Sequence, residues 1–226
     1  MSLLSSLLPL FALSLSLSLQ AQAAPLDSCS SLIGTCEYYN CVETERLSCG
    51  ADGYPLGYGA NYCEKLSALE FFPARTSLGA ATFPADGNEW RDGVRSCLQE
   101  EMDEYFASHT QVSCEGLKAF AFDSHPKCYT QAPSASFCEL TVESVVKVGL
   151  TIAPKDLFTA ESLRQVATTA TLCSQQLTER LKTEKSALVR FNLHKYRVLW
   201  NSIAANPASF SDQLQTLSPD IGSQFE

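Results

Sequence analysis

The sequence predicts an all-α fold: a disulfide-stapled helical bundle that forms a single domain with a flexible C-terminal tail. Three observations lead to this prediction. Apolar residues recur at steps of three and four along most of the chain after residue 60. Segments rich in Gly and Pro separate these stretches. The chain also contains 10 cysteines, an even number that suits disulfide pairing.

The N-terminal segment predicts secretion. Residues 3–19 form an uncharged run of mainly Leu, Ser, Phe and Ala, and residues 21–23, Ala-Gln-Ala, supply the small side chains that signal peptidase requires. A membrane anchor is the alternative, but a run of about 17 residues is short for a span of about 20. We therefore expect residues 1–23 to be a secretory signal peptide and the mature protein to be extracellular.

Composition narrows the class of the mature protein. The net charge is −9, and the 16 Lys and Arg residues are too scattered for a surface that follows phosphates, which argues against nucleic acid as a partner. No later stretch is apolar enough for a membrane span. The remaining length suits one domain, which we place at residues 24–205. Residues 206–226 are polar, and we expect them to form a flexible tail.

The cysteines are expected to form five disulfides, the default in an oxidising compartment. They lie at positions 29, 36, 41, 49, 63, 97, 114, 128, 138 and 173. Structural zinc is the alternative, but the chain has no CxxC pair, and His109, His125 and His194 do not cluster with closely spaced cysteines. We therefore expect no metal site.

The first part of the mature chain is expected to contain little regular helix. Residues 27–50 hold four cysteines, and we predict a short helix or helix-turn pinned by disulfides. Residues 50–59 contain four Gly and one Pro, which is typical of a loop. A helix is predicted over residues 61–72, where apolar residues share one face, and Pro73 ends it. Residues 73–88 then form a surface connection.

A strong helix is predicted next, with Asp86 or Asn88 as its cap. Its apolar residues follow the helical period: Trp90, Val94, Cys97, Leu98, Met102 or Tyr105, and Phe106. The acidic residues Glu100, Glu101, Asp103 and Glu104 fit the solvent-exposed face of this helix. The alternative is that they form a metal site. A further helix is predicted over residues 112–122, and Pro126 interrupts the chain after it.

Three helices complete the predicted bundle. Residues 137–148 mix β-branched residues with helical spacing, and the disulfide-rich helical context favours a helix. Asp156 or Thr159 can cap a helix that reaches Cys173. A long helix over residues 175–204 pairs an apolar face with a basic outer side: Lys182, Lys185, Arg190, Lys195 and Arg197.

The sequence indicates no assembled catalytic site, so we expect neither enzymatic activity nor a cofactor. GxSxG, P-loop, GxGxxG and HExxH patterns are absent. Residues 58–63 and 125–129 look slightly like secreted phospholipase A2, whose catalytic His is followed directly by a calcium-ligating Asp. Here Pro126 follows His125, and proline offers Ca²⁺ no side-chain oxygen. We interpret His125 as an ordinary turn residue.

The order of the cysteines resembles that of the stanniocalcin family, a group of secreted helical glycoprotein hormones. The early four-cysteine cluster contains Cys36-Glu-Tyr-Tyr-Asn-Cys41-Val-Glu. Asp52-Gly53-Tyr54, followed later by Tyr62-Cys63, resembles a lengthened form of the family's Asp-Gly-x-Tyr-x-x-Cys. The intervals from Cys114 to Cys128-Tyr129 and from Cys138 to Cys173 are also those of the family. The resemblance covers roughly residues 29–205.

The resemblance implies a disulfide pattern that spacing alone could not select, because ten cysteines allow hundreds of pairings. The implied pairs are Cys29–Cys41, Cys36–Cys63, Cys49–Cys114, Cys97–Cys128 and Cys138–Cys173. Two features depart from the family. No Cys follows Cys173, so a covalent dimer is not supported, although residues 175–204 could still pack in a non-covalent homodimer. The glycosylation sequon near the N-terminal cluster is also missing.

The function implied by the resemblance is that of a secreted hormone-like signalling or regulatory protein, associated with calcium and phosphate homeostasis. Its partner would be an extracellular protein, either a receptor or a protease. The alternatives are a secreted inhibitor of an extracellular protease and a degenerate phospholipase A2-like enzyme. As binding surfaces we expect the basic side of residues 175–204 and an exposed loop carrying Tyr54 and Tyr58.

Overall fold

The computed structural model describes residues 29–71, 85–133 and 135–222, and within these ranges it contains helices and no strand. The all-α, disulfide-stapled prediction is confirmed. The predicted signal peptide, residues 1–23, lies outside the described residues. The α-helices are α1 (Glu37–Cys41), α2 (Asn61–Ser67), α3 (Gly87–Ser108), α4 (Cys114–Gln131), α5 (Val142–Leu150), α6 (Pro154–Leu157), α7 (Ala160–Thr183), α8 (Ala187–Ala205) and α9 (Pro207–Gly222).

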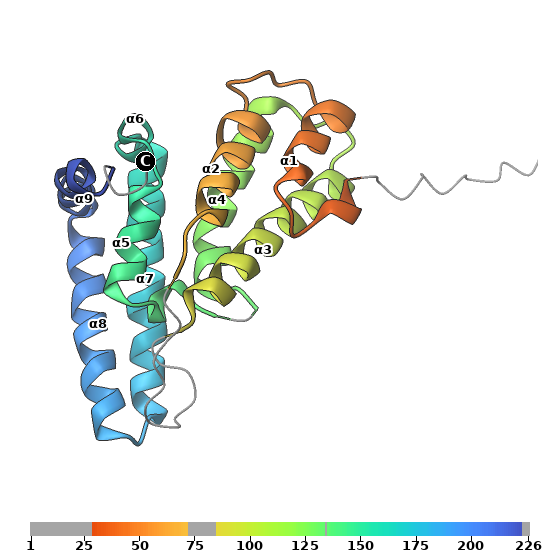
Figure 1. The fold of residues 1–226 in the computed structure, drawn as a ribbon. Coiled ribbons are helices and arrows are strands. Elements are labelled where there is room, and N and C mark those ends of the chain that lie inside the picture. Colours follow the sequence, from red (N-terminus) through yellow and green to blue (C-terminus); the bar gives the residue numbers. More distant parts are fainter. Residues whose placement is uncertain (1–28, 72–84, 134, 223–226) are drawn as a thin grey trace, which may run out of the picture.

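Four short helices of other types join them. They are the 3₁₀ turns η1 (Ser30–Leu32) and η4 (Phe137–Glu139), and the wider π-type helices η2 (Val42–Arg46) and η3 (Tyr54–Ala60). In Figure 1, α1 to α4 gather in one half of the molecule and α5 to α9 in the other. The long helices α7 and α8 form an antiparallel pair, and α4 packs on α7, which joins the two halves.

Two apolar clusters form the core. The first lies within the N-terminal half and includes Tyr38, Val42, Met102 and Leu117, each 0% exposed. The second joins the halves through three aromatic side chains. Trp90 of α3 lies 5.0 Å from Phe137 of η4, and Phe137 lies 5.6 Å from Trp200 of α8, measured between ring centroids.

All ten cysteines are paired in five disulfides. The pairs are Cys29–Cys41, Cys36–Cys63, Cys49–Cys114, Cys97–Cys128 and Cys138–Cys173, the same five that the resemblance implies. Three of them hold the short N-terminal helices together and onto α4, one joins α3 to α4, and one joins η4 to α7. Helices as short as α1 and α2 are marginal alone, so these crosslinks help to hold them in place.

Local capping places two of the long helices where the sequence predicts them. The Asp86 carboxylate accepts hydrogen bonds from the backbone N–H groups of Asn88 and Glu89, at 2.7 and 3.3 Å, and begins α3. The Thr159 hydroxyl accepts from the N–H of Ser162 at 3.2 Å and begins α7. Each cap satisfies a donor that the first helical turn leaves without a partner. Of the two candidate caps at each site, the structure selects Asp86 and Thr159.

Pro126 does not interrupt the chain as predicted, because α4 continues through it to Gln131. A proline inside a helix cannot donate to the carbonyl four residues earlier, which here belongs to Phe122. That carbonyl instead accepts a hydrogen bond of 2.9 Å from the side-chain amide of Gln165 on α7. A partner from another helix thus replaces the missing donor.

Other helix boundaries also differ from the prediction. The single helix predicted over residues 175–204 is two helices, α7 and α8, separated at residues 184–186. Ser186 accepts from the N–H of Val189 at 3.4 Å as the cap of α8. Arg190 donates to the carbonyls of Leu181 and Glu184 at 2.6 and 3.1 Å, which fixes the turn. Helix α2 ends at Ser67, and within residues 137–148 a 3₁₀ turn precedes α5.

The predicted flexible tail, residues 206–226, is wrong over its first part. Residues 207–222 form α9, in which Ser211 and Leu214 are buried. Asn206 accepts from the N–H of Ser209 at 3.1 Å, and Pro207 occupies the first turn, where proline is tolerated. A Cβ on Gly149 would lie 2.4 Å from the Leu214 side chain, so glycine allows α9 to dock closely on α5.

Because α9 docks through Leu214, we expect truncation of this side chain to lower the stability of the protein measurably. Because this side chain is 1% exposed, Leu214→Ala should lower the free energy of unfolding by about 2–4 kcal/mol. Chemical denaturation measures the loss, and Asp212→Ala, at an exposed position of the same helix, serves as the control with a change within about 0.5 kcal/mol. Equal, near-zero effects of the two substitutions would show that this segment is a tail after all.

Candidate functional site

A pocket of about 110 Å³ lies between the two halves of the molecule. Six aromatic rings line it, and we call it the aromatic pocket: Tyr39, Tyr54, Tyr58, Tyr62, Phe122 and Tyr129. Five aliphatic side chains also line it: Leu66, Val94, Leu98, Val148 and Ile152. A neighbouring pocket of about 80 Å³ shares Tyr129, Val148, Ile152, Ser162 and Gln165 with it, so the two spaces adjoin.

The tyrosines of η3 and α2 form one wall because they recur every fourth residue, which places them on one helical face. Tyr54 and Tyr58 lie 6.3 Å apart with nearly parallel rings, and Tyr58 and Tyr62 lie 6.1 Å apart. A Cβ on Gly59 would lie 2.3 Å from the Tyr39 ring, so only glycine allows η3 to lie this close to α1. The prediction of an exposed loop at Tyr54 and Tyr58 is therefore wrong: Tyr54 is 3% exposed and Tyr58 is half-buried.

A carboxylate lies at the pocket wall beside these tyrosines. The Tyr62 hydroxyl donates to Asp156 of α6 at 2.5 Å, and the Tyr58 hydroxyl donates to its other oxygen at 3.5 Å. The Tyr62 oxygen in turn accepts from the N–H of Ala153 at 3.2 Å. Burial, followed by the hydrogen bond to Asp156, raises the pKa of Tyr62 to about 12, so this phenol stays protonated and keeps donating at neutral pH.

His125 lies on α4 and lines the same pocket, so its interpretation as a turn residue is wrong. Its Nδ1 is 2.5 Å from the carbonyl oxygen of Ala121, one helical turn earlier. A carbonyl only accepts, so Nδ1 must carry the hydrogen and Nε2 is left as an acceptor. Burial lowers the pKa of His125 to about 4, which keeps the ring neutral at pH 7.

His125 predicts a specific dependence of stability on pH. The unfolded chain takes up a proton near pH 6.5, whereas the folded chain resists protonation down to about pH 4. Between these values the unfolded state binds more protons, so stability falls as pH falls, by up to about 1.4 kcal/mol per pH unit. His125→Asn, which keeps a donor for the Ala121 carbonyl, removes this term.

Denaturation curves at several pH values measure the effect. We expect the wild-type protein to lose more stability between pH 6.5 and 4 than the His125→Asn variant, and the two curves to run parallel below pH 4. Parallel curves across the whole range would show that His125 titrates normally in the folded protein.

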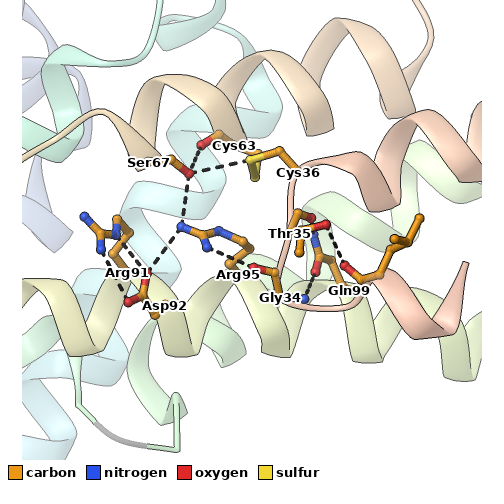
Figure 2. Close-up of a disulfide and its surroundings, with 10 residues drawn as sticks. Gly34, Thr35, Cys36, Cys63, Ser67, Arg91, Asp92, Arg95 and Gln99 are labelled. Atoms are coloured by element: carbon orange, nitrogen blue, oxygen red, sulfur yellow. Dashed lines mark hydrogen bonds and ion pairs between the residues drawn. A yellow bond between two sulfur atoms is a disulfide. The ribbon is translucent and has the colours of Figure 1, made fainter.

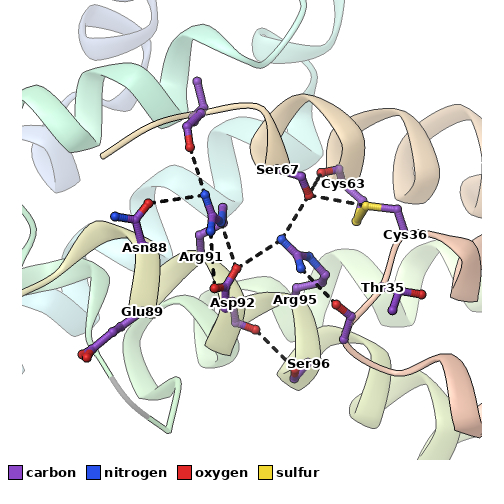
Figure 3. Close-up of polar contacts among 12 residues, drawn as sticks. Thr35, Cys36, Cys63, Ser67, Asn88, Glu89, Arg91, Asp92, Arg95 and Ser96 are labelled. Atoms are coloured by element: carbon purple, nitrogen blue, oxygen red, sulfur yellow. Dashed lines mark hydrogen bonds and ion pairs between the residues drawn. A yellow bond between two sulfur atoms is a disulfide. The ribbon is translucent and has the colours of Figure 1, made fainter. Parts of the chain in front are cut away.

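Beside the pocket, a polar network holds the N-terminal segment on α3 (Figures 2 and 3). The Arg95 guanidinium donates to the Gly34 carbonyl at 2.9 Å and to the Ser67 hydroxyl at 3.0 Å, and it pairs with Asp92 at 3.3 Å. Gln99, which is 0% exposed, accepts from the N–H of Gly34 and donates to the Thr35 carbonyl, both at 2.6 Å. These contacts surround the Cys36–Cys63 disulfide and fix the α1–α2 wall of the pocket.

The acidic group of α3 is only partly a solvated face. Glu100 and Glu104 are exposed, as predicted, but Glu101 pairs with Lys127. Asp103 accepts from Arg46 at 2.8 Å and from the Tyr38 hydroxyl at 3.2 Å, so it joins α3 to the N-terminal helices. Among the residues that the structure describes, no group of three or more His, Cys, Asp or Glu side chains is arranged to hold a metal ion.

The outer face of α8 carries the most exposed of the large apolar side chains in the described part of the chain. Leu188, Phe191 and Val198 are 53%, 57% and 53% exposed, and their spacing places them on one face. Lys195 lies on this face with its Nζ 4.4 Å from the Phe191 ring centroid. We call these four residues the α8 strip. Of the predicted basic side chains, Lys182 pairs with Glu179, while Arg190 donates to the carbonyls of Leu181 and Glu184.

Fold and crosslinks together define a class, that of disulfide-stapled all-α proteins. No family model, curated protein or solved structure matches the chain. None of the helices in the described ranges has the length and apolar character needed to cross a membrane. Five disulfides are typical of proteins that fold in an oxidising compartment, and they are compatible with a secreted protein.

Proposed function

We propose that the chain is a secreted, hormone-like regulatory protein of the stanniocalcin type, which acts by binding an extracellular protein. The observation that carries this proposal is the disulfide connectivity. The five pairs of the structure are those that the resemblance implies, out of hundreds of possible pairings of ten cysteines. A role in calcium and phosphate homeostasis is part of the same proposal and rests on the resemblance alone.

The α8 strip is the surface that suits such binding best. Its inner neighbours Leu193 and Trp200 are 0% and 2% exposed, so the helix is anchored before any partner arrives. A surface that is already ordered loses little conformational entropy on binding. The Lys195 ammonium among these apolar side chains favours a partner with an apolar patch that carries an acidic residue.

The geometry gives the phospholipase alternative little support. The Nδ1 of His125 is engaged by a backbone carbonyl, and the residue that follows is Pro126, which offers no oxygen ligand. No feature of the described residues favours a protease inhibitor over a receptor ligand. The two alternatives differ only in whether the extracellular partner is a protease or a receptor.

Saturable binding to cells of the source organism tests the proposal. Labelled wild-type protein should bind, and unlabelled protein should displace it. A Phe191→Asp, Val198→Asp double variant should bind at least about tenfold more weakly, because it places two charges in the apolar strip. Val142→Asp, at a 49% exposed position on α5, is the matched control and should bind normally. All three proteins should unfold at similar denaturant concentrations.

Two outcomes contradict the proposal. One is the absence of any saturable, displaceable binding of the wild-type protein. The other is equal binding of the double variant and the Val142→Asp control, which would remove the α8 strip from the interaction. Inhibition of a protease secreted by the same cells, without binding to their surface, would favour the inhibitor alternative.

A further inference from the structure

We propose that the aromatic pocket binds a small organic ammonium ion, with its charged head beside Asp156, Tyr58 and Tyr62 and its apolar body against the aliphatic side chains of the lining. This inference is independent of the proposed function, because none of the residues that line the pocket belongs to the α8 strip.

The size of the pocket limits the ligand to about one ring with a short chain. An apolar cavity of about 150 Å³ accommodates benzene. The aromatic pocket, of about 110 Å³, continues into the adjoining space of about 80 Å³. Leu66, Val94 and Leu98 form an aliphatic wall suited to a ring or a short alkyl group.

The charge pattern of the lining favours a cation. Asp156 receives hydrogen bonds from two tyrosines, but a carboxylate has about four positions for accepting them, so it can still accept from an ammonium group. Aromatic faces attract cations through the ring quadrupole, and six rings surround this space. His125 adds an acceptor, since its Nδ1 holds the hydrogen. Val148 in the last turn of α5 and Thr151, the residue that caps this helix, both line the pocket and bring the negative end of a helix dipole near it.

Among the described residues that line the pocket, no Lys or Arg side chain is left without a partner and available to pair with Asp156 in place of the ligand. Arg95 is the one Lys or Arg among the lining residues, and its guanidinium already contacts Gly34, Ser67 and Asp92. Lys118 lies 5.2 Å from the Tyr58 ring centroid but does not line the pocket. A carboxylate ligand would therefore face Asp156 without a cationic partner, whereas an ammonium ligand would be complemented.

Calorimetry with three probes of similar size tests the inference on the full secreted protein at pH 7. The probes are 2-phenylethylamine, 2-phenylethanol and 3-phenylpropanoate, which are cationic, neutral and anionic. We expect the amine to bind at least about tenfold more tightly than the alcohol, and the carboxylate to bind most weakly. This ranking is measured on the unmodified protein, so it does not depend on a variant that must fold.

The isosteric Asp156→Asn variant then locates the charged head. It should weaken binding of the amine by about tenfold and leave binding of the alcohol unchanged. Asp123→Asn, at an exposed carboxylate on α4 that pairs with Arg164, is the matched control and should change neither. The inference is overturned if no probe binds, if the alcohol or the carboxylate binds as tightly as the amine, or if Asp156→Asn behaves like the control.

Discussion

Removing the Cys138–Cys173 disulfide by a double substitution to alanine should lower the free energy of unfolding by about 3–5 kcal/mol. The bridge closes a loop with a sequence separation of 35, and without it the unfolded chain gains conformational entropy. Both cysteines are 0% exposed in the cluster that joins the two halves, so their loss also leaves a cavity. The backbone of Cys138 is part of the same core, because its carbonyl accepts from the Trp200 indole at 3.2 Å.

The Cys49–Cys114 pair provides the matched control for this double substitution. Its sequence separation is 65, so loop entropy alone predicts a larger effect, by about 0.5 kcal/mol. Both of its cysteines are partly exposed, however, and removing them leaves a smaller buried void. We expect the Cys138–Cys173 variant to be the less stable of the two in urea denaturation. The reverse order would show that core packing around Cys138 contributes little.

Substitution of Trp90 by alanine should lower the free energy of unfolding by about 3–5 kcal/mol, the range for deleting a large buried aromatic side chain. Trp90 is 0% exposed, and its ring packs on Phe137 and Tyr129, with centroids 5.0 and 5.6 Å away. Its indole N–H donates to the Tyr129 carbonyl at 3.1 Å. That carbonyl lies in the last turn of α4, where carbonyls lack helical partners.

Trp90→Phe separates packing from hydrogen bonding at this site. It keeps most of the ring contact and loses the donor to the Tyr129 carbonyl, so we expect a loss of about 1–3 kcal/mol, smaller than that of Trp90→Ala. Chemical denaturation followed by the fluorescence of Trp200 measures both variants. A loss below about 1 kcal/mol for Trp90→Ala would contradict the assignment of Trp90 to the core that joins the halves.

Features encoded by neighbouring residues could be predicted from the sequence. The cap at Asp86 and the apolar residues from Trp90 to Phe106 lie within one helix, and α3 follows them. Thr159 and α7 are a second example. The disulfide pairs were not predictable from spacing, and they entered only through the resemblance of the whole cysteine order.

Features that depend on distant contacts were missed. The continuation of α4 past Pro126 depends on Gln165, which lies 43 residues from Phe122 in the sequence. The docking of α9 depends on the fit between Leu214 and Gly149. The polar composition of residues 206–226 favoured a flexible tail instead.

The pocket was only partly visible in the sequence. The spacing of Tyr54, Tyr58 and Tyr62 is a helical signal, but the density of glycine in residues 50–59 favoured a loop instead. No local pattern could place Asp156 and His125 beside these tyrosines, because that meeting follows from the packing of α4 on α7 and of α6 on the pocket wall.

Peptide mapping of the purified protein without reduction, by mass spectrometry, tests the central claim most directly, namely that five internal crosslinks hold this helical scaffold together. We expect five linked peptide pairs that join Cys29 to Cys41, Cys36 to Cys63, Cys49 to Cys114, Cys97 to Cys128 and Cys138 to Cys173, and no thiol that reacts with an alkylating agent. A free thiol, or any linked pair other than these, would contradict the fold and the resemblance together.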